Sequence, residues 1–81
     1  PAQVRRGMNG RPVKRSVTLH GHRTSVSLEE AFWQEFRRLA AARGQTLNAL
    51  ACEIDEGRGD VGLASAIRVF VLLEVRRAAQ V

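Results

Sequence analysis

Residues 13–28 have the alternation of side chains that predicts β-structure, because Val, Thr and Ser recur there at every second position. The alternation breaks once, across His20-Gly21-His22. A slip of one residue turns every later side chain to the opposite face, so the segment contains either a glycine-centred bulge or a turn. Before the tripeptide Val17 and Leu19 are odd-numbered, whereas after it Thr24, Val26 and Leu28 are even-numbered.

One arrangement compatible with this pattern is a hairpin within the chain. A two-residue loop at Gly21-His22 would place Val17 opposite Val26 and Leu19 opposite Thr24.

The other arrangement is a single strand at about residues 23–28. A lone strand does not persist in water, so it would pair with its copy in a second subunit. The two-stranded ribbon of this homodimer would turn one set of side chains outward, toward a DNA major groove: Arg23, Ser25 and Ser27. If residues 16–20 also pair with residues 23–28, the ribbon of the dimer becomes four-stranded and too wide for the groove, which would favour a protein-interaction function.

Helical spacing follows the strand region. Ser27-Leu28-Glu29-Glu30 matches a capping box and predicts a helix over about residues 29–43, ended by Gly44. Thr46 can cap a second helix, over about residues 46–56. A third helix is expected after the glycine-rich stretch that follows, at about residues 63–77. Its apolar positions cover most of its circumference, which predicts burial on more than one side and therefore a subunit interface.

Basic residues are concentrated at the front of the chain. Residues 1–28 contain six basic side chains and no acid, whereas residues 29–81 contain seven arginines and eight acids. We expect residues 1–12 to form a flexible basic arm and residues 13–81 to form the folded domain. Twelve of the thirteen basic residues are arginine, whose planar group suits phosphates and guanine edges. A solubilising arm is the alternative interpretation of the same charges.

A chain of 81 residues allows one domain, whose core seldom supplies more than roughly 3–5 kcal/mol, so oligomerisation is expected. The lone Cys52 excludes an internal disulfide and favours a cytoplasmic setting. We find no catalytic constellation and no set of zinc ligands, and therefore expect no enzyme, no metal and no cofactor. The longest apolar run, residues 69–73, is far too short to span a membrane.

Three stretches together resemble the short bacterial ribbon-helix-helix domain family, which belongs to the Arc/MetJ-like superfamily. They are Arg23-Thr24-Ser25-Val26-Ser27-Leu28 followed by Phe32-Trp33, the turn from Arg43 to Leu50, and Ser65 to Leu72. The resemblance covers about residues 13–75. It implies a mainly α fold with a short N-terminal β-strand, arranged as an intertwined ribbon-helix-helix homodimer, and leaves the third helix as an addition to the minimal plan.

The resemblance also implies roles for individual residues of a dimeric DNA-binding transcription regulator. Arg23, Ser25 and Ser27 would contact bases. The phosphate contacts would come from Thr46, Leu47, Asn48, Arg11, Lys14 and Arg15. The core of the dimer would contain Thr24, Val26, Leu28, Phe32, Trp33, Phe36, Leu50, Ile54 and Phe70. The alternative is a protein-interaction or antitoxin-like module with a basic face, and a second protein is a candidate partner for the third helix.

Overall fold

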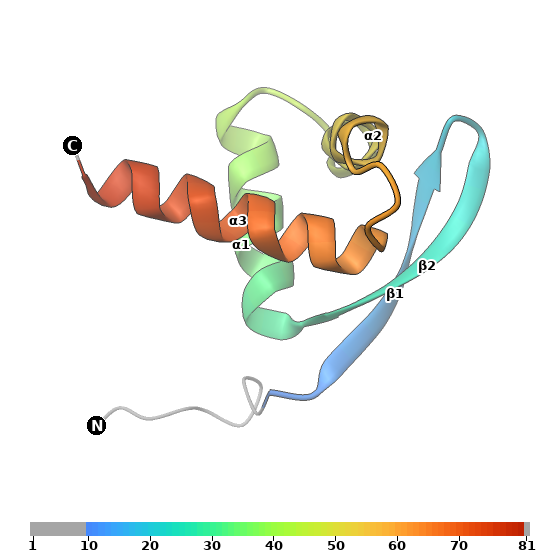
Figure 1. The fold of residues 1–81 in the computed structure, drawn as a ribbon, viewed down its shortest axis with the longest axis horizontal. Helices are drawn as coiled ribbons and strands as arrows, with labels where there is room; N and C mark the ends of the chain where they lie inside the picture. The colour runs from blue at the N-terminus through green and yellow to red at the C-terminus, as the bar shows by residue number, and fades with distance from the viewer. Residues whose placement is uncertain (1–9, 81) are drawn as a thin grey trace.

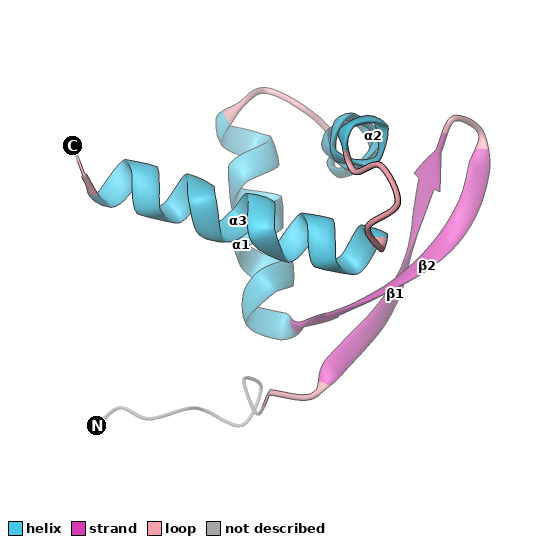
Figure 2. Cartoon of the chain, in the orientation of Figure 1, coloured by secondary structure: helices cyan, strands magenta, loops and turns pink. Residues whose placement is uncertain are grey.

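The computed structural model describes residues 10–80, in which a β-hairpin precedes three helices (Figures 1 and 2). Most of the expected flexible arm, residues 1–9, lies outside the described residues; Pro12 already belongs to the first strand. The elements are β1 (Pro12–Leu19), β2 (His22–Glu29), α1 (Glu30–Ala42), α2 (Leu47–Gly57) and α3 (Leu63–Ala79).

The two strands are antiparallel and form a two-stranded sheet within the chain. The loop between them is His20-Gly21, one residue earlier than the predicted Gly21-His22, so that Val17 pairs with Thr24 and Leu19 with His22. The predicted pairs Val17–Val26 and Leu19–Thr24 are therefore wrong. The reason is the backbone of the loop: tight hairpin turns of this kind need positive φ at both central residues, and His20 (51°) and Gly21 (84°) adopt it.

The strand expected at about 23–28 is longer than the sequence pattern suggested, and it has an intramolecular partner. Ser27 lies inside β2 opposite Lys14, so the predicted capping box at the start of the first helix does not form. Glu29 is the residue before α1, and no side chain there accepts a capping hydrogen bond. Pairing with β1 holds Ser27 extended, which removes its hydroxyl from the helix start.

The helices agree with the expected segments to within two residues at each end. At the end of α1, Gly44 takes a φ of 70°, a conformation that glycine adopts without strain. The N-cap of α2 is Thr46, as predicted, and its Oγ1 accepts a hydrogen bond from the Ala49 N–H at 3.0 Å. None of the described helices is long and apolar enough to cross a membrane.

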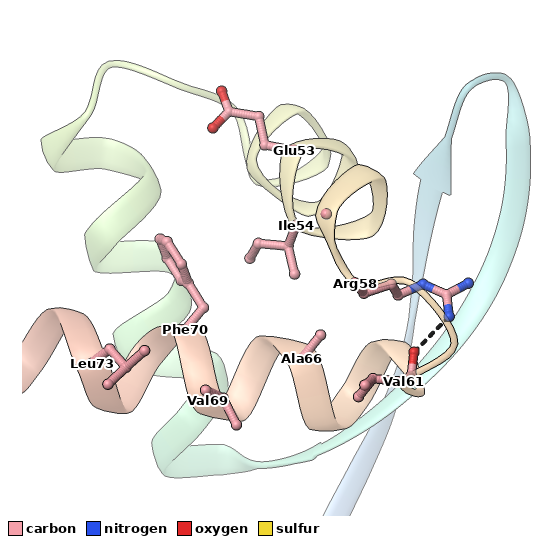
Figure 3. Close-up of a pocket in the computed structure, with 9 residues that line it drawn as sticks. Glu53, Ile54, Arg58, Val61, Ala66, Val69, Phe70 and Leu73 are labelled. Carbon is pink, nitrogen blue, oxygen red and sulfur yellow. Dashed lines mark hydrogen bonds between the residues drawn. The ribbon is translucent and has the colours of Figure 1, made fainter.

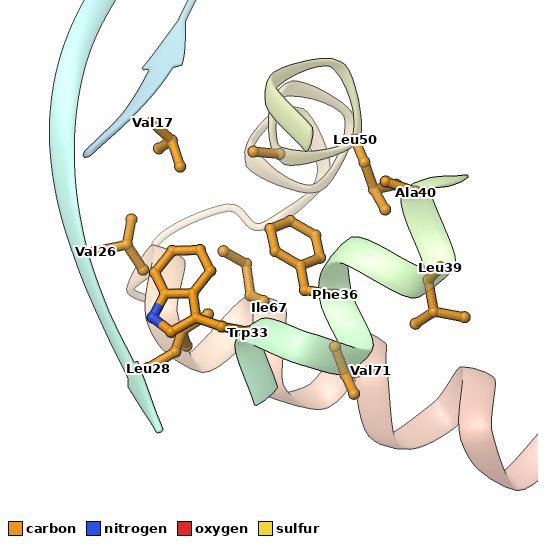
Figure 4. Packing of buried hydrophobic residues seen from close by; sticks show 11 residues of the cluster. Val17, Val26, Leu28, Trp33, Phe36, Leu39, Ala40, Leu50, Ile67 and Val71 are labelled. Atoms are coloured by element: carbon orange, nitrogen blue, oxygen red, sulfur yellow. The ribbon is translucent and has the colours of Figure 1, made fainter. Parts of the chain in front are cut away.

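The core lies between the inner face of the hairpin and the three helices, with α1 at its centre (Figure 4). The side chains of Trp33 and Phe36 have no exposed surface, and their rings lie 6.2 Å apart. α3 supplies Ile67 and Val71 to the same cluster. The other buried members are Val17, Val26, Leu28, Leu39, Ala40, Leu50 and Ala51.

The residues expected in a dimer core are thus packed within one chain. Val26, Leu28, Trp33, Phe36 and Leu50 are buried there, while Thr24, Phe32, Ile54 and Phe70 are partly buried. Because α3 packs against α1 and adds Ile67 and Val71 to the cluster, this chain builds a core without a second subunit. The packing of the predicted dimer-core residues against a second subunit stays a prediction.

Candidate nucleic-acid interface

The hairpin presents one polar face to solvent. Residues that oppose each other in an antiparallel pair lie on the same face of the sheet. The register therefore gathers eight side chains on the face turned away from the helices, in the pairs Pro12–Glu29, Lys14–Ser27, Ser16–Ser25 and Thr18–Arg23. The three pairs from Lys14–Ser27 to the turn carry two cations and four hydroxyls, and the acid Glu29 lies at the base of the hairpin, where Arg68 binds it.

The two cations lie at opposite ends of these three pairs and on different strands. Lys14 is near the start of β1 and Arg23 is next to the turn, and both are exposed. Ser16 and Ser25 are exposed between them, and Thr18 and Ser27 are partly buried. We call these six residues the outer hairpin face. The structure brings together the three predicted base-contacting residues and Lys14, and it adds Ser16 and Thr18.

Three contacts fix the hairpin against the helices. The indole Nε1 of Trp33 donates a hydrogen bond to the Val13 carbonyl at 2.8 Å. At the other end of β1, the Thr18 N–H donates to Asn48 Oδ1 at 3.0 Å, and Cys52 Sγ lies 3.9 Å from the Thr18 carbonyl, to which it donates. The outer hairpin face is thus carried by a strand tied to two helices, which orders it before any ligand binds.

The same contacts show which edge of the sheet is free. Both backbone polar groups of Thr18 point to α2 and away from β2. Opposed residues in an antiparallel pair direct these groups either toward each other or apart. The backbone groups of Arg23, Ser25 and Ser27 therefore point to the outer edge of β2. At one end of that edge the Arg68 guanidinium covers the chain, because its Nη2 donates to the Ser27 carbonyl at 3.3 Å.

Two carboxylates at the junction of β2 and α1 are paired with arginines. Arg68 Nε donates to Glu29 Oε1 at 2.9 Å, and this hydrogen bond lowers the pKa of the Glu29 carboxyl. Arg15 Nη1 donates to Glu30 Oε1 at 3.1 Å and lowers the pKa of Glu30 in the same way. Both acids are therefore held ionised beside the base of the hairpin.

Arg15 is placed differently from the other predicted phosphate contacts. It opposes Val26 on the inner face, its guanidinium is bound to Glu30, and it also lies 5.6 Å from the centre of the Trp33 ring. The structure does not bring Arg15 together with Lys14, because successive residues of a strand point to opposite faces. Arg11 precedes β1 and is exposed.

The start of α2 adjoins the turn end of the hairpin, because Asn48 contacts Thr18. The side chains of Thr46 and Asn48 already have partners within the chain, in Ala49 N and Thr18 N. Both side chains accept these hydrogen bonds through oxygen, so the Thr46 O–H and the Asn48 Nδ2 remain donors for the predicted phosphate clamp, beside the first-turn amides of Leu47 and Asn48 and the positive end of the helix dipole.

No cluster of three or more metal-ligating side chains occurs among residues 10–80. His20, at the turn, lies near Glu56, with Nε2 3.7 Å from the carboxylate. Sequence reasoning missed Ser16 and Thr18 on the outer face. The signal that could have found them is the parity of the strand positions, once the loop is placed at His20-Gly21.

The element order, a β-hairpin followed by three helices, is consistent with a ribbon-helix-helix fold that has an additional C-terminal helix. The sequence pattern of the family described as the ribbon-helix-helix domain matches residues 12–75, most of the chain, so the protein belongs to this family. The fold is typical of DNA-binding regulators and antitoxins, is typically non-catalytic, and generally binds DNA as a dimer. Comparisons with curated proteins and with solved structures gave no match.

Proposed function

We propose that the protein is a dimeric DNA-binding transcription regulator of the cytoplasm, which inserts the hairpin of β1 and β2 into the major groove. The observation that carries the proposal is the outer hairpin face. It joins two cations to four hydroxyls, and the acid at its base, Glu29, is paired with Arg68; the strand pair is held in place by Trp33 and Asn48. Such a face has donors for phosphate oxygens and for base edges.

The dimensions of the hairpin suit this function. Paired strands lie about 4.8 Å apart and the major groove is about 12 Å wide, so one two-stranded ribbon with its side chains fits. Four strands would span roughly 14 Å between the outer two, which is wider than the groove. The intramolecular hairpin is therefore the ribbon that we assign to the groove, in place of a sheet assembled from four strands of two chains.

Within this arrangement the residues have different tasks. Arg23 is long and forked, and we assign it to a guanine edge, with Ser25 and Ser27 as shorter neighbouring contacts. Lys14 is a point charge suited to a phosphate oxygen. The amides at the start of α2 and Arg11 extend the backbone contacts on either side.

The direct test is a titration of the protein into fluorescent duplex DNA at several salt concentrations, followed by anisotropy. We expect affinity to fall linearly on a log-log plot, with a slope of about −0.9 for each phosphate contact. The Arg77→Ala variant is the matched control, since Arg77 is an exposed arginine at the far end of α3. Affinity that is absent at low salt, or that is insensitive to salt, refutes the proposal.

A protein-interaction or antitoxin-like module is the second candidate function. It is favoured by the apolar surface that α3 leaves exposed, with Leu72 and Leu73 about half accessible. This function predicts co-purification with a different protein from the native cell and little affinity for duplex DNA. The salt titration and the co-purification therefore separate the two candidates.

A further inference from the structure

α3 has a second apolar face, directed away from the core. Ile67 and Val71 of this helix are buried, whereas Val69, Leu72 and Leu73 are 55%, 52% and 53% exposed. The exposed three are spaced i, i+3 and i+4, so they form one stripe on the helix surface. We call them the α3 stripe. An exposed stripe of this kind in so small a domain indicates an interaction surface.

The stripe borders an open cleft of about 470 Å³ between α2 and α3 (Figure 3). Ile54 of α2 and Phe70 of α3 extend into the space between the two helices, and Val61 and Ala66 line its end near the start of α3. A smaller hollow of about 200 Å³ lies on the other side of the helix, against α1, and includes Leu72. The α3 stripe is therefore a ridge between two apolar depressions. Such a surface can insert side chains between those of a second helix and can also receive side chains from it.

Charges of opposite sign lie at the two ends of α3. Arg76 is exposed in its last turn, and Asp60 is exposed just before its first. Neither takes part in an ion pair among residues 10–80. Arg77, the neighbour of Arg76, is bound to Glu74 of its own helix. A second helix lying antiparallel on the stripe would bring each unpaired charge close to its opposite.

We propose that α3 is the seam between two copies of this chain, packed antiparallel about Val69. With the two Val69 residues opposite each other, Leu73 of each copy lies opposite Ser65 of the other, beside Ala66, on the side of the helix that borders the cleft. In the same register Arg76 lies opposite Gly62, next to Asp60. Helices packed in this way lie 8–10 Å apart, a distance set by side chains of this size.

A second copy fits this surface better than an unrelated partner because the surface is complementary to itself. One isologous contact fills both clefts, covers both stripes and pairs both sets of terminal charges. The use of this dimer, to bring two hairpins to one DNA duplex, rests on the proposed function. The dimer itself is measured without DNA, so its failure and the failure of DNA binding are distinguishable.

The first experiment measures the mass of the full-length protein by sedimentation equilibrium over a dilution series. We expect a dimer that dissociates on dilution, and a dissociation constant raised at least roughly 30-fold by Leu72→Glu with Leu73→Glu. Ala41→Glu, at the exposed end of α1, is the matched control and should leave the dimer intact. Circular dichroism and thermal melts of each variant establish that the fold is retained.

The end charges provide a test that does not touch the apolar surface. Asp60→Arg and Arg76→Asp should each weaken the dimer, because each places like charges at the seam. The double variant restores an opposite pair and should recover the association. Both positions are exposed, and Asp60 does not cap α3, whose N-cap is Gly62, so the fold is expected to tolerate the changes.

The register is tested by crosslinking. In a Cys52→Ser background, Val69→Cys should be joined rapidly between copies by a short bismaleimide, because Val69 lies at the proposed symmetry axis. Ala41→Cys is the control and should react without forming a dimer. A crosslink of equal yield at both positions contradicts the antiparallel contact.

The competing dimer, in which the free edges of two β2 strands pair, is an outcome of the same series. Ser25→Pro removes an N–H that points to the free edge, and leaves the ladder to β1 intact. We expect the Ser25→Pro protein to remain dimeric. A wild-type protein that is monomeric at all concentrations overturns the proposal. So does a dimer that Ser25→Pro dissolves and the α3 variants do not.

Discussion

The outer hairpin face and the α3 stripe are both turned to solvent, yet one is wholly polar and the other wholly apolar. Each lies on an element whose opposite side is buried. The hairpin buries Val26 and Leu28, and α3 buries Ile67 and Val71. The period differs, two along the strands and about 3.6 along the helix. The hairpin and α3 therefore both pack one apolar side into the core, but the sides that they leave exposed differ in polarity.

The difference separates what folding requires from what it does not. Hydroxyls and cations on the hairpin remain hydrated and cost the fold nothing. Half-exposed leucines on α3 keep apolar surface in water, and the core does not need them, since Ile67 and Val71 already close it. The hairpin is therefore suited to a hydrated, charged ligand, and α3 to a surface as apolar as itself.

The largest effect is expected from a residue that supports both regions. Trp33 is fully buried under the hairpin, and its ring packs against Phe36 in the core cluster to which α3 also contributes. Trp33→Ala should lower the free energy of unfolding by about 3–5 kcal/mol, measured by urea denaturation, and should abolish both DNA binding and self-association.

The matched change is Trp33→Phe, which keeps an aromatic ring and removes the donor to the Val13 carbonyl. It should cost about 1–3 kcal/mol. A Trp33→Ala protein as stable as the wild type would show that the hairpin does not depend on the core for its position.

The inner and outer sides of α3 should respond very differently to the same chemical change. Ile67→Ala removes a side chain with no exposed surface and should cost about 2–5 kcal/mol in urea denaturation. Leu72→Ala, at a half-exposed position, should cost the monomer less than about 1 kcal/mol under conditions in which no dimer is present. Equal losses would mean that the α3 stripe belongs to the core of the chain itself.

Substitution of Arg23 tests the assignment of the hairpin to the DNA major groove. Arg23→Ala should lose about 1–3 kcal/mol of discrimination between a preferred duplex and one with the contacted base pair exchanged. Lys14→Ala should weaken binding to all duplexes alike and reduce the salt slope by about one. Anisotropy titrations with both duplexes measure each effect. If the two variants behave alike, Arg23 is a phosphate contact.

Much of this arrangement is accessible from the sequence, because the relevant signals are local. Thr46 and Gly44 mark helix ends through their own backbone and side-chain chemistry, and the structure places them as predicted. The face that carries Arg23, Ser25 and Ser27 follows from strand alternation alone. The crowded apolar pattern of residues 63–77 indicated a helix covered on more than one side, and the structure shows one side covered.

Other features were inaccessible because they depend on contacts distant in the sequence. Whether residues 12–19 pair with β2 or leave it to a second subunit is decided by the turn at His20-Gly21 and by Asn48, 30 residues away from Thr18. Arg15 looks like Lys14 in a list of basic residues. Only the register shows that it turns inward to Glu30, and only the helix packing brings Arg68 to Glu29.

The smallest expected effect concerns the acids between the two regions. The pKa values of Glu29 and Glu30 are lowered in the folded chain, chiefly by hydrogen bonds from Arg68 and Arg15. A carboxyl whose folded pKa is depressed stabilises the fold above its unfolded pKa of about 4.3, and this contribution is lost as the pH falls through the folded value. The urea midpoint should therefore fall with acid below about pH 4.3.

The double variant Glu29→Gln with Glu30→Gln tests this origin. Its urea midpoint at pH 7 should be lower than that of the wild type, and the gap between the two proteins should narrow toward pH 3. Glu56→Gln with Glu53→Gln, on α2, removes the same number of negative charges away from the junction and serves as the control. The loss of stability in the Glu29→Gln, Glu30→Gln variant should be modest, because the two ion pairs of these glutamates are partly exposed and solvent screens them. A gap that stays constant with pH would mean that the two glutamates stabilise the junction by packing and not by charge.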